Sequence, residues 1–496
     1  MDHPPPAPRF PRPLWLRPGL AAVIVAGYTA FLCQYISPYA GGADSSGYLN
    51  SARLLSRGEV SAPVRTIPGH PAREFGAATY QPLGFTLPAS GDRMVPTYPI
   101  GLPLHLLVGA GIAGWSRAAI AVNLLMALGS GGLMWAFARQ LHLGPMAAGA
   151  GAIVLCLCPV LLFSALQPMS DLLSLAWSLA TLYCALRVRD NLLWACACGV
   201  AFSLAVLVRP TNLLLAIPTL VALAWHWRVF LAVTLGGLPG STLLAFYNWK
   251  VYGTPVTTGY GDVRSAFSPD FLPHNLLHFA HWIPLLLTPL VVGALAAPFL
   301  PEARQRGFAV LAVWSATLIG FYSFYYHSGE TWWYLRFILP AFPTLIIAAL
   351  FAMESIGRNS GIPARIRPVA AAVLMILAAG WQIAQSRRLH VCQLKRDEQS
   401  YPDAAHWARA NLPPEAVVFC MQVSGAFYYY TDFLLLRWEQ TAPDQFAGLL
   451  AAAAQANRPV YAALFPFEQP EALERVGGHW TKLATVGQVT IWQRQP

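Results

Sequence analysis

The stretch ADSSGYLNSARLL, Ala43 to Leu55, directly follows the first long apolar run of the chain, Leu14 to Ile36. Its spacing predicts a short amphipathic helix with Asp44 in the first turn, at the point where a bilayer would end and water begin. Asp is common at helix N-termini, so one interpretation of Asp44 is a helix cap. The other is a carboxylate fixed at a membrane surface, well placed to act on a lipid-borne substrate.

The composition is that of an integral membrane protein. Of the 496 residues, 56% are hydrophobic and only 11% are charged, whereas soluble domains carry about a quarter charged residues. The net charge of +10 therefore concerns orientation in a membrane, and we expect no nucleic-acid partner. Apolar runs long enough to cross a bilayer occur at about eleven places, namely 14–36, 117–138, 145–166, 170–187, 192–208, 211–227, 229–248, 275–299, 308–326, 336–354 and 367–385. The run 100–115 is too short and is predicted to be interfacial or re-entrant.

Basic residues set the predicted orientation. With the N-terminus in the cytoplasm, the short cytoplasmic connections hold most of the arginines, as the positive-inside rule requires: Arg139, Arg187, Arg189, Arg228, Arg304, Arg306, Arg358, Arg365 and Arg367. Arg117, Arg387 and Arg388 run against this assignment. We expect a multi-pass protein of the cytoplasmic (inner) membrane with a long first extracytoplasmic loop at 38–116. The Pro-rich N-terminal tail precedes a run long enough to span, so we expect a retained first span rather than a removed leader.

The character of the chain changes after residue 388. Short apolar segments typical of strands follow, namely VVFCMQV (417–423), FLLLRW (433–438), PVYAALF (459–465) and VTIWQR (489–494). The stretch KRDEQSYPDAAHWARANLPPEA (395–416) predicts a polar amphipathic helix that leads into a Pro-Pro turn. Together with the helical stretches LLAAAAQANR (449–458) and EALERVGG (471–478), these segments predict an extracytoplasmic α/β domain at 389–496. Cys392 and Cys420 lie in it, and a disulfide and two buried thiols both fit the sequence. The predicted fold is an all-α polytopic membrane domain at 1–388, followed by this small α/β domain.

Two carboxylates and three cations fall on the extracytoplasmic side of this topology. Asp44 lies in the first loop, and Asp171, in LQPMSDLL, opens a span, where a helix cap is again the alternative. Ionisable groups near membrane depth are costly and usually face a water-filled site, so we expect these carboxylates to share a cavity as catalytic groups. Arg209, Arg336 and Lys250 are candidates to bind a donor phosphate. Snorkelling at the interface is the alternative for the arginines.

Polar and aromatic residues that suit a sugar or an acceptor lie on the same side: Tyr48, Tyr80, Tyr98, His327 and Glu330. For the aromatic-rich segment 321–334, the alternative is an interfacial belt. The segment 59–99 holds so many Pro and Gly residues that it must be largely irregular, yet its apolar content needs burial. We expect it to fold over the outer cavity beside Asp44 as a lid, with Tyr80 and Tyr98 near the sugar; a passive loop is the alternative. The scattered His, Asp and Glu residues show no convincing metal-binding spacing.

The order of the polar motifs carries a family resemblance. The early-loop Asp is followed by YPIGLPL (98–104), PMSDLL (168–173), LVRPTNLL (207–214), YNWKVYGTPVTTGYG (247–261) and WWYLRFILPAFP (332–343). This series resembles the GT-C membrane glycosyltransferases, which include bacterial aminoarabinose transferase, protein O-mannosyltransferases and bacterial lipopolysaccharide sugar transferases. The resemblance covers most of 14–385 and extends loosely to the tail, because bacterial members often carry an extracytoplasmic α/β domain.

The resemblance implies transfer of a hexosyl or pentosyl sugar from a polyprenyl-phosphate carrier to a lipid, glycan or protein acceptor of the cell envelope. Asp44 corresponds to the usual base of the family and Asp171 to its second acidic residue. Many members have two adjacent acidic residues in the first loop, whereas Ser45 follows Asp44 here. This departure favours the metal-independent branch, so no cofactor is expected and a divalent cation is the less supported alternative.

A multi-span transporter or lipid flippase is the main alternative function. A transporter should carry ionisable groups near the middle of its spans. In this chain the charges cluster at one face, and the middle of each span is almost purely Leu, Ala, Val and Gly. A scaffold that only presents the C-terminal domain is a third interpretation, although it would not need a first loop this long and aromatic-rich.

Overall fold

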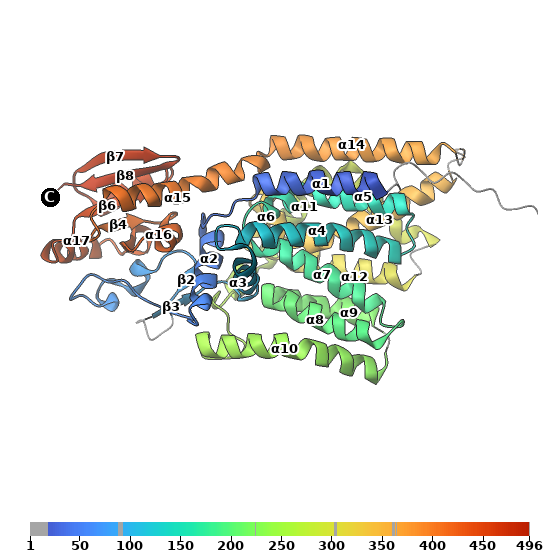
Figure 1. The fold of residues 1–496 in the computed structure, drawn as a ribbon, viewed down its shortest axis with the longest axis horizontal. Coiled ribbons are helices and arrows are strands. Elements are labelled where there is room, and N and C mark those ends of the chain that lie inside the picture. The colour runs from blue at the N-terminus through green and yellow to red at the C-terminus, as the bar shows by residue number, and fades with distance from the viewer. Residues whose placement is uncertain are drawn as a thin grey trace, which may run out of the picture.

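The computed structural model describes residues 18–87, 93–223, 225–301, 305–359, 363 and 365–495. The N-terminal tail and Arg304, which entered the topology prediction, lie outside the described residues. Figure 1 shows a helical bundle with a small sheet domain at one end, where the C-terminus also lies. Helix α2 (Ala43–Ser56) lies at this same end. The helix that carries Asp44 is therefore found where the bundle meets the sheet domain.

The bundle is built from apolar helices that follow the order of the runs in the sequence. They are α1 (Pro18–Tyr35), α4 (Ala118–Gln140), α5 (Pro145–Leu157), α6 (Pro159–Ala165), α7 (Ser170–Leu186), α8 (Leu192–Val208), η4 (Pro210–Leu215), α9 (Ala216–Ala222), α10 (Trp227–Tyr252), α11 (Leu272–Leu287), η7 (Pro289–Phe299), α12 (Arg306–Tyr322), η10 (Trp332–Ala341), α13 (Phe342–Asn359) and α14 (Arg367–Arg388). Among the described residues, four helices are long and apolar enough to cross a membrane, or six if each bent pair is one span. The protein is thus helical and multi-pass in character, while the count of eleven crossings stays a prediction.

Proline accounts for the bent pairs. Pro159 follows the end of α5, and the axes of α5 and α6 differ by 58°. Pro289 follows α11 in the same way, and there the bend to η7 is 109°. A proline removes a backbone donor and clashes with the preceding turn, so a helix breaks at that point. The short helix α3 (Gly101–Ala113), which we predict not to cross, packs against α2, α4 and α8.

The C-terminal domain contains a five-stranded mixed sheet, ordered β5-β4-β6-β8-β7. Its strands are β4 (Val417–Cys420), β5 (Leu434–Arg437), β6 (Val460–Leu464), β7 (Trp480–Val486) and β8 (Val489–Arg494), and its helices are α15 (Leu394–Asn411), α16 (Ser424–Tyr430), α17 (Gln445–Gln455) and α18 (Gln469–Val476). The four strands and three helices that the sequence indicated are therefore confirmed, and β7 was missed. Cys392 and Cys420 are both free thiols in the structure, not a disulfide.

The described part of the first loop packs against the C-terminal domain. It forms η2 (Ala72–Phe75), η3 (Ala77–Tyr80) and a three-stranded sheet of β1 (Ala62–Pro63), β3 (Arg93–Pro96) and β2 (Phe85–Thr86). Tyr80 is only 2% exposed and lies in one apolar cluster with Phe75, Val417 and Phe419. The sheet domain therefore buries this part of the loop, and the placement of Tyr80 near the sugar stays a prediction.

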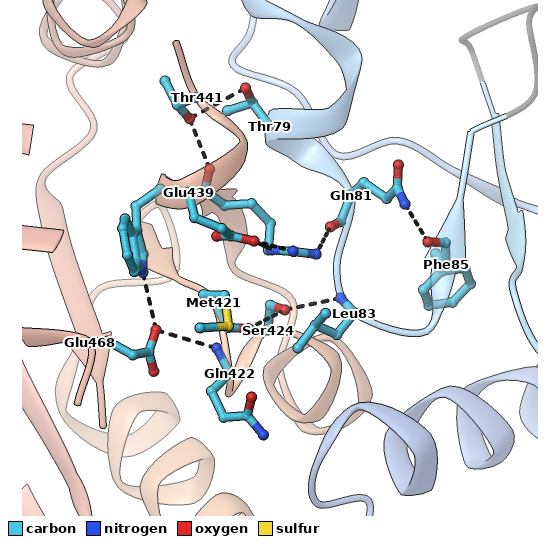
Figure 2. A network of polar contacts seen from close by, with 12 residues as sticks. Thr79, Gln81, Leu83, Phe85, Met421, Gln422, Ser424, Glu439, Thr441 and Glu468 are labelled. Carbon is cyan, nitrogen blue, oxygen red and sulfur yellow. Dashed lines mark hydrogen bonds and ion pairs between the residues drawn. The ribbon is translucent and has the colours of Figure 1, made fainter. Parts of the chain in front are cut away.

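Polar contacts fasten the same interface, as Figure 2 shows. The Leu83 amide donates to the Ser424 hydroxyl at 3.0 Å, and the Arg437 guanidinium donates to the Gln81 carbonyl at 3.1 Å. Burial raises the pKa of Glu468, which accepts from the indole N–H of Trp438 at 3.1 Å beside this interface. The loop and the sheet domain thus form one unit at the end of the bundle.

Candidate active site

The two candidate carboxylates each lie in the first turn of a helix without capping it. The N-cap of α2 is Gly42 and that of α7 is Met169, and neither helix has a side-chain cap hydrogen bond. The simple capping interpretation of Asp44 and Asp171 is therefore wrong. Negative charge is still favoured there by the helix dipole. Both carboxylates remain free to make other contacts.

Each carboxylate forms an ion pair with an arginine from a distant part of the chain. Asp44 Oδ2 lies 3.1 Å from Arg336 Nη2, and Asp171 Oδ1 lies 2.8 Å from Arg209 Nη2. The Asp44 side chain is 30% exposed, whereas the Asp171 side chain is 1% exposed. One pair is thus accessible and the other is buried.

The two ion pairs belong to one cluster. Arg209 Nε donates to Ser170 Oγ at 3.0 Å, and the Tyr48 hydroxyl of α2 donates to the same oxygen at 2.9 Å. Phe337 lies beneath both guanidinium groups, with its ring centre 5.5 Å from Arg209 Cζ and 5.3 Å from Arg336 Cζ. The elements α2, α7, the junction between α8 and η4, and η10 are therefore joined here through side chains.

Tyrosines line the side of Asp44 that faces the first loop. The rings of Tyr48 and Tyr98 lie 4.8 Å apart, and Tyr260 meets Tyr98 edge-on at 6.2 Å. Burial raises the pKa of Tyr98 well above its usual value, and the adjacent Asp44 carboxylate, to which its hydroxyl is hydrogen-bonded, adds to the rise. The pKa of Tyr48 is raised by burial and by Asp44 in the same way. Both hydroxyls therefore stay protonated and act as donors.

His327 and Glu330 lie at the edge of this cluster. His327 Nδ1 is 2.9 Å from Glu330 Oε1, and both side chains are partly exposed. The His327 ring stacks on Tyr334 at 5.2 Å, and Tyr334 in turn lies 5.5 Å from Arg336 Cζ. Aromatic rings and paired polar groups at a half-open edge suit the faces and hydroxyls of a sugar.

Lys250 stands apart from the other candidate cations. It lies in the last turn of α10 on the exposed side of that helix. Among the described residues, no ion pair or hydrogen bond joins its side chain to Asp44, Asp171 or their arginines. The structure therefore brings together two of the three cations that the sequence singled out.

The residues of the site do not suit a divalent cation. Both carboxylates face guanidinium groups, whose positive charge opposes a metal ion. Within the part of the chain that the structure describes, no three His, Cys, Asp or Glu side chains form a group that could hold a metal.

Sequence reasoning missed two neighbours of Asp44. Tyr260 lies between Gly259 and Gly261 in the motif YNWKVYGTPVTTGYG. Gly259 packs so closely on the Thr97 backbone that a side chain at this position would overlap it. An aromatic residue between two glycines was the sequence signal that could have marked this close approach of the backbone. Glu398 comes from α15, and its carboxylate accepts the Gly42 N–H at 3.3 Å. Nothing in the sequence pairs residues 356 positions apart.

Solved structures share this architecture. ArnT from Cupriavidus metallidurans bound to undecaprenyl phosphate aligns with a TM-score of 0.59 and 16% identity, over 97% of this chain and 100% of that one. The arabinofuranosyltransferase AftD from Mycobacteria aligns with a TM-score of 0.56 and 13% identity, over 96% of this chain and 42% of AftD.

The oligosaccharyltransferase of Archaeoglobus fulgidus, tethered with an acceptor peptide, aligns with a TM-score of 0.52 and 10% identity, over 97% of this chain and 75% of that one. No protein-family model and no curated protein matches the sequence. Identities this low speak for the fold rather than for the substrate. The chain therefore has the fold of the GT-C membrane glycosyltransferases, as its motifs predict.

Proposed function

We propose that the protein transfers a sugar from a polyprenyl-phosphate donor to a hydroxyl group of an envelope lipid, glycan or protein on the extracytoplasmic side of the cytoplasmic membrane. The observation that carries this proposal is the linked pair of Asp–Arg contacts, Asp44 with Arg336 and Asp171 with Arg209. A fold shared with ArnT bound to undecaprenyl phosphate supports the choice of donor class.

The proposed reaction is a direct displacement at the anomeric carbon. The acceptor oxygen forms a bond to that carbon while the bond from the carbon to the phosphate oxygen breaks. The acceptor proton passes to Asp44, and polyprenyl phosphate leaves with the electron pair. A single displacement of this kind inverts the configuration of the sugar carbon.

The two carboxylates take different roles in this proposal. Asp44 is 30% exposed, so an acceptor hydroxyl has access to it, and we assign it as the general base. Asp171 is 1% exposed and touches Arg209, so it acts as a positioning residue that holds the guanidinium. Buried arginines require such a partner.

The two guanidinium groups are proposed to bind the donor phosphate. Arg209 and Arg336 both lie over Phe337. A planar guanidinium group can donate two parallel hydrogen bonds to two oxygens of one phosphate. The charge of the two arginines would stabilise the negative charge that grows on the leaving phosphate. Tyr48, Tyr98, His327 and Glu330 would contact the sugar and the acceptor, whereas Lys250 is left out of this site.

Cleavage of the carrier is the decisive measurement. Purified protein in lipid vesicles is mixed with a polyprenyl-phosphate-linked sugar and an envelope extract, and released polyprenyl phosphate is quantified. We expect release by the wild type and its loss in Asp44→Asn. Uptake or flipping of the lipid without cleavage would instead support the transporter and contradict this proposal.

The orientation is part of the proposal and has its own test. We infer that the N-terminus is cytoplasmic and the C-terminal domain extracytoplasmic, in agreement with the arginine distribution. A reporter that is active only outside the cytoplasm, fused to the C-terminus, should be active. Activity only of a cytoplasmic reporter would refute the orientation.

A further inference from the structure

The turn that precedes α2 is held by a carboxylate of the C-terminal domain. Glu398 Oε2 accepts the Gly42 N–H at 3.3 Å, two residues before Asp44. A Cβ added at Gly41 would overlap the Glu398 carboxylate, so any larger residue at this position would displace that side chain. The fit between the turn and the carboxylate is therefore close.

Further contacts from the same domain fix the same part of the chain. The Ala40 N–H donates to the Tyr430 hydroxyl at 3.0 Å, and Lys395 Nζ donates to the Gln34 carbonyl at 2.8 Å. On α2 itself, the Asn50 side chain donates to the Gly425 carbonyl at 2.9 Å. The sheet domain thus forms hydrogen bonds to the chain both before and after Asp44.

The electrostatic surroundings of Glu398 make it sensitive to pH near neutrality. The pKa of Glu398 is raised to about 7, mainly by burial. The Gly42 N–H opposes this rise, and the charges of Asp44 on α2 and Asp397 on its own helix contribute to it. Tyr401, also on α15, is a further titratable group that interacts with it, and burial raises the pKa of that hydroxyl too. Beyond Asp44 lies Arg336, which pairs with that carboxylate.

We propose that Glu398 is a positioning residue for Asp44, holding the Gly41–Gly42 turn at the start of α2 and supplying a second carboxylate beside the proposed base. This inference rests on the proposed function. It gives the C-terminal domain a direct part in the reaction, because that domain carries Glu398 and the side chains around it.

The sign of the pH effect follows from the charge. Below pH 7 Glu398 is mostly protonated and neutral, and above pH 7 it becomes a carboxylate. A second negative charge beside Asp44 attracts the acceptor proton while it is being transferred, so the ionised form of Glu398 favours this step. Transfer should therefore rise between pH 6 and pH 8 as Glu398 ionises.

Two substitutions separate the charge from the contact. Glu398→Gln keeps an oxygen that accepts the Gly42 N–H but removes the titration, so the rise between pH 6 and pH 8 should disappear. At pH 8 the kcat of this variant should be about tenfold lower than that of the wild type, with KM for the donor unchanged. Asp403→Asn is the matched control, since Asp403 is an exposed acidic residue on the same helix. Its profile should follow that of the wild type.

A double-mutant cycle tests the contact itself. Gly41→Ala should lower kcat in the wild type, because the new methyl group pushes Glu398 aside. In the Glu398→Ala background the methyl group has room, so the same substitution should cost much less. Residues in contact show such coupling, whereas independent sites are additive. A full, additive loss from Gly41→Ala in that background would overturn the inference.

The outcomes distinguish this inference from the proposed function. If the wild type transfers sugar and Asp44→Asn does not, while Glu398→Gln keeps the wild-type kcat and pH profile, the positioning role is refuted and the function stands. If the wild type cleaves no carrier, the proposed function fails and the role of Glu398 fails with it. If Glu398→Gln loses the alkaline rise and Asp403→Asn keeps it, the positioning role is supported.

Discussion

Arg336 and Asp44 lie 3.1 Å apart, although one residue belongs to η10 and the other to the first turn of α2. The same guanidinium also interacts with Asp171 and Arg209, so the four side chains share one electrostatic field. In the proposed reaction Arg336 has two partners, the base and the donor phosphate. In that reaction Asp44 and the donor phosphate compete for the Arg336 guanidinium.

Asp44→Asn should abolish transfer while sparing donor binding. Removal of a general base typically lowers the rate by about 10²–10⁴-fold. The substitution also frees Arg336 from its carboxylate partner, so the affinity for undecaprenyl phosphate should stay equal or increase. Rates are measured by carrier release and affinity by binding of undecaprenyl phosphate to the purified protein.

Asp190→Asn is the control for this experiment, because Asp190 forms an exposed pair with Arg187 outside the site. It should behave as the wild type in both assays. Weakened lipid binding by Asp44→Asn at an unchanged transfer rate would contradict the assignment of Asp44 as the base.

Asp171→Asn should damage stability as well as activity. It leaves Arg209, whose side chain is 16% exposed, without its buried carboxylate partner. Breaking a buried ion pair in this way costs about 3–5 kcal/mol of the free energy of unfolding. Thermal denaturation in detergent should therefore show a clearly lower midpoint for Asp171→Asn than for Asp44→Asn.

The double variant Asp171→Leu with Arg209→Met checks the cause of that loss. Apolar replacement of both partners of a buried pair is often neutral or stabilising. The double variant should recover thermal stability and still lack transfer, because the phosphate-binding guanidinium is gone. Recovered transfer in the double variant would exclude Arg209 from the phosphate site.

The sequence predicted which polar residues come together better than it predicted which of them pair. Asp44, Asp171, Arg209 and Arg336 each stand at the end of an apolar run, where charge is costly unless it is used, and the structure gathers all four. Which arginine pairs with which carboxylate depends on helix packing between distant segments. That information is absent from the local pattern.

The failures have physical causes of the same kind. The apolar content of the loop around Tyr80 correctly required burial, but the partner is a sheet face formed by Val417 and Phe419, far along the chain. Strand β7 was missed because it is largely exposed and lacks an apolar alternation. Glu398 was not predicted as a site residue because the sequence shows it only as one of several charged residues on a polar helix.

The two loop tyrosines make a matched pair for the next test. Tyr98→Phe keeps the ring against Tyr48 but removes the hydroxyl beside Asp44, so transfer should fall, by about tenfold if one hydrogen bond to a charged group is lost. Tyr80→Phe removes a buried hydroxyl that has no partner among the described residues. Transfer should be unchanged, and thermal stability equal or slightly higher. A loss of transfer in Tyr80→Phe alone would support the predicted placement of Tyr80 near the sugar.

Limited proteolysis with trypsin distinguishes a fixed first loop from a closing lid. Arg65 donates to the carbonyls of Thr431 and Phe433 at 3.0 Å and 3.2 Å, and its guanidinium lies 4.3 Å from the Tyr428 ring centre. Trypsin needs a free arginine side chain, so cleavage after Arg65 should be slow even without lipid. Arg73, which is exposed on η2, should be cut first. Because the loop is already fastened to the sheet domain, undecaprenyl phosphate should change neither rate, and protection of Arg73 on adding the lipid would instead support a lid that closes over the donor.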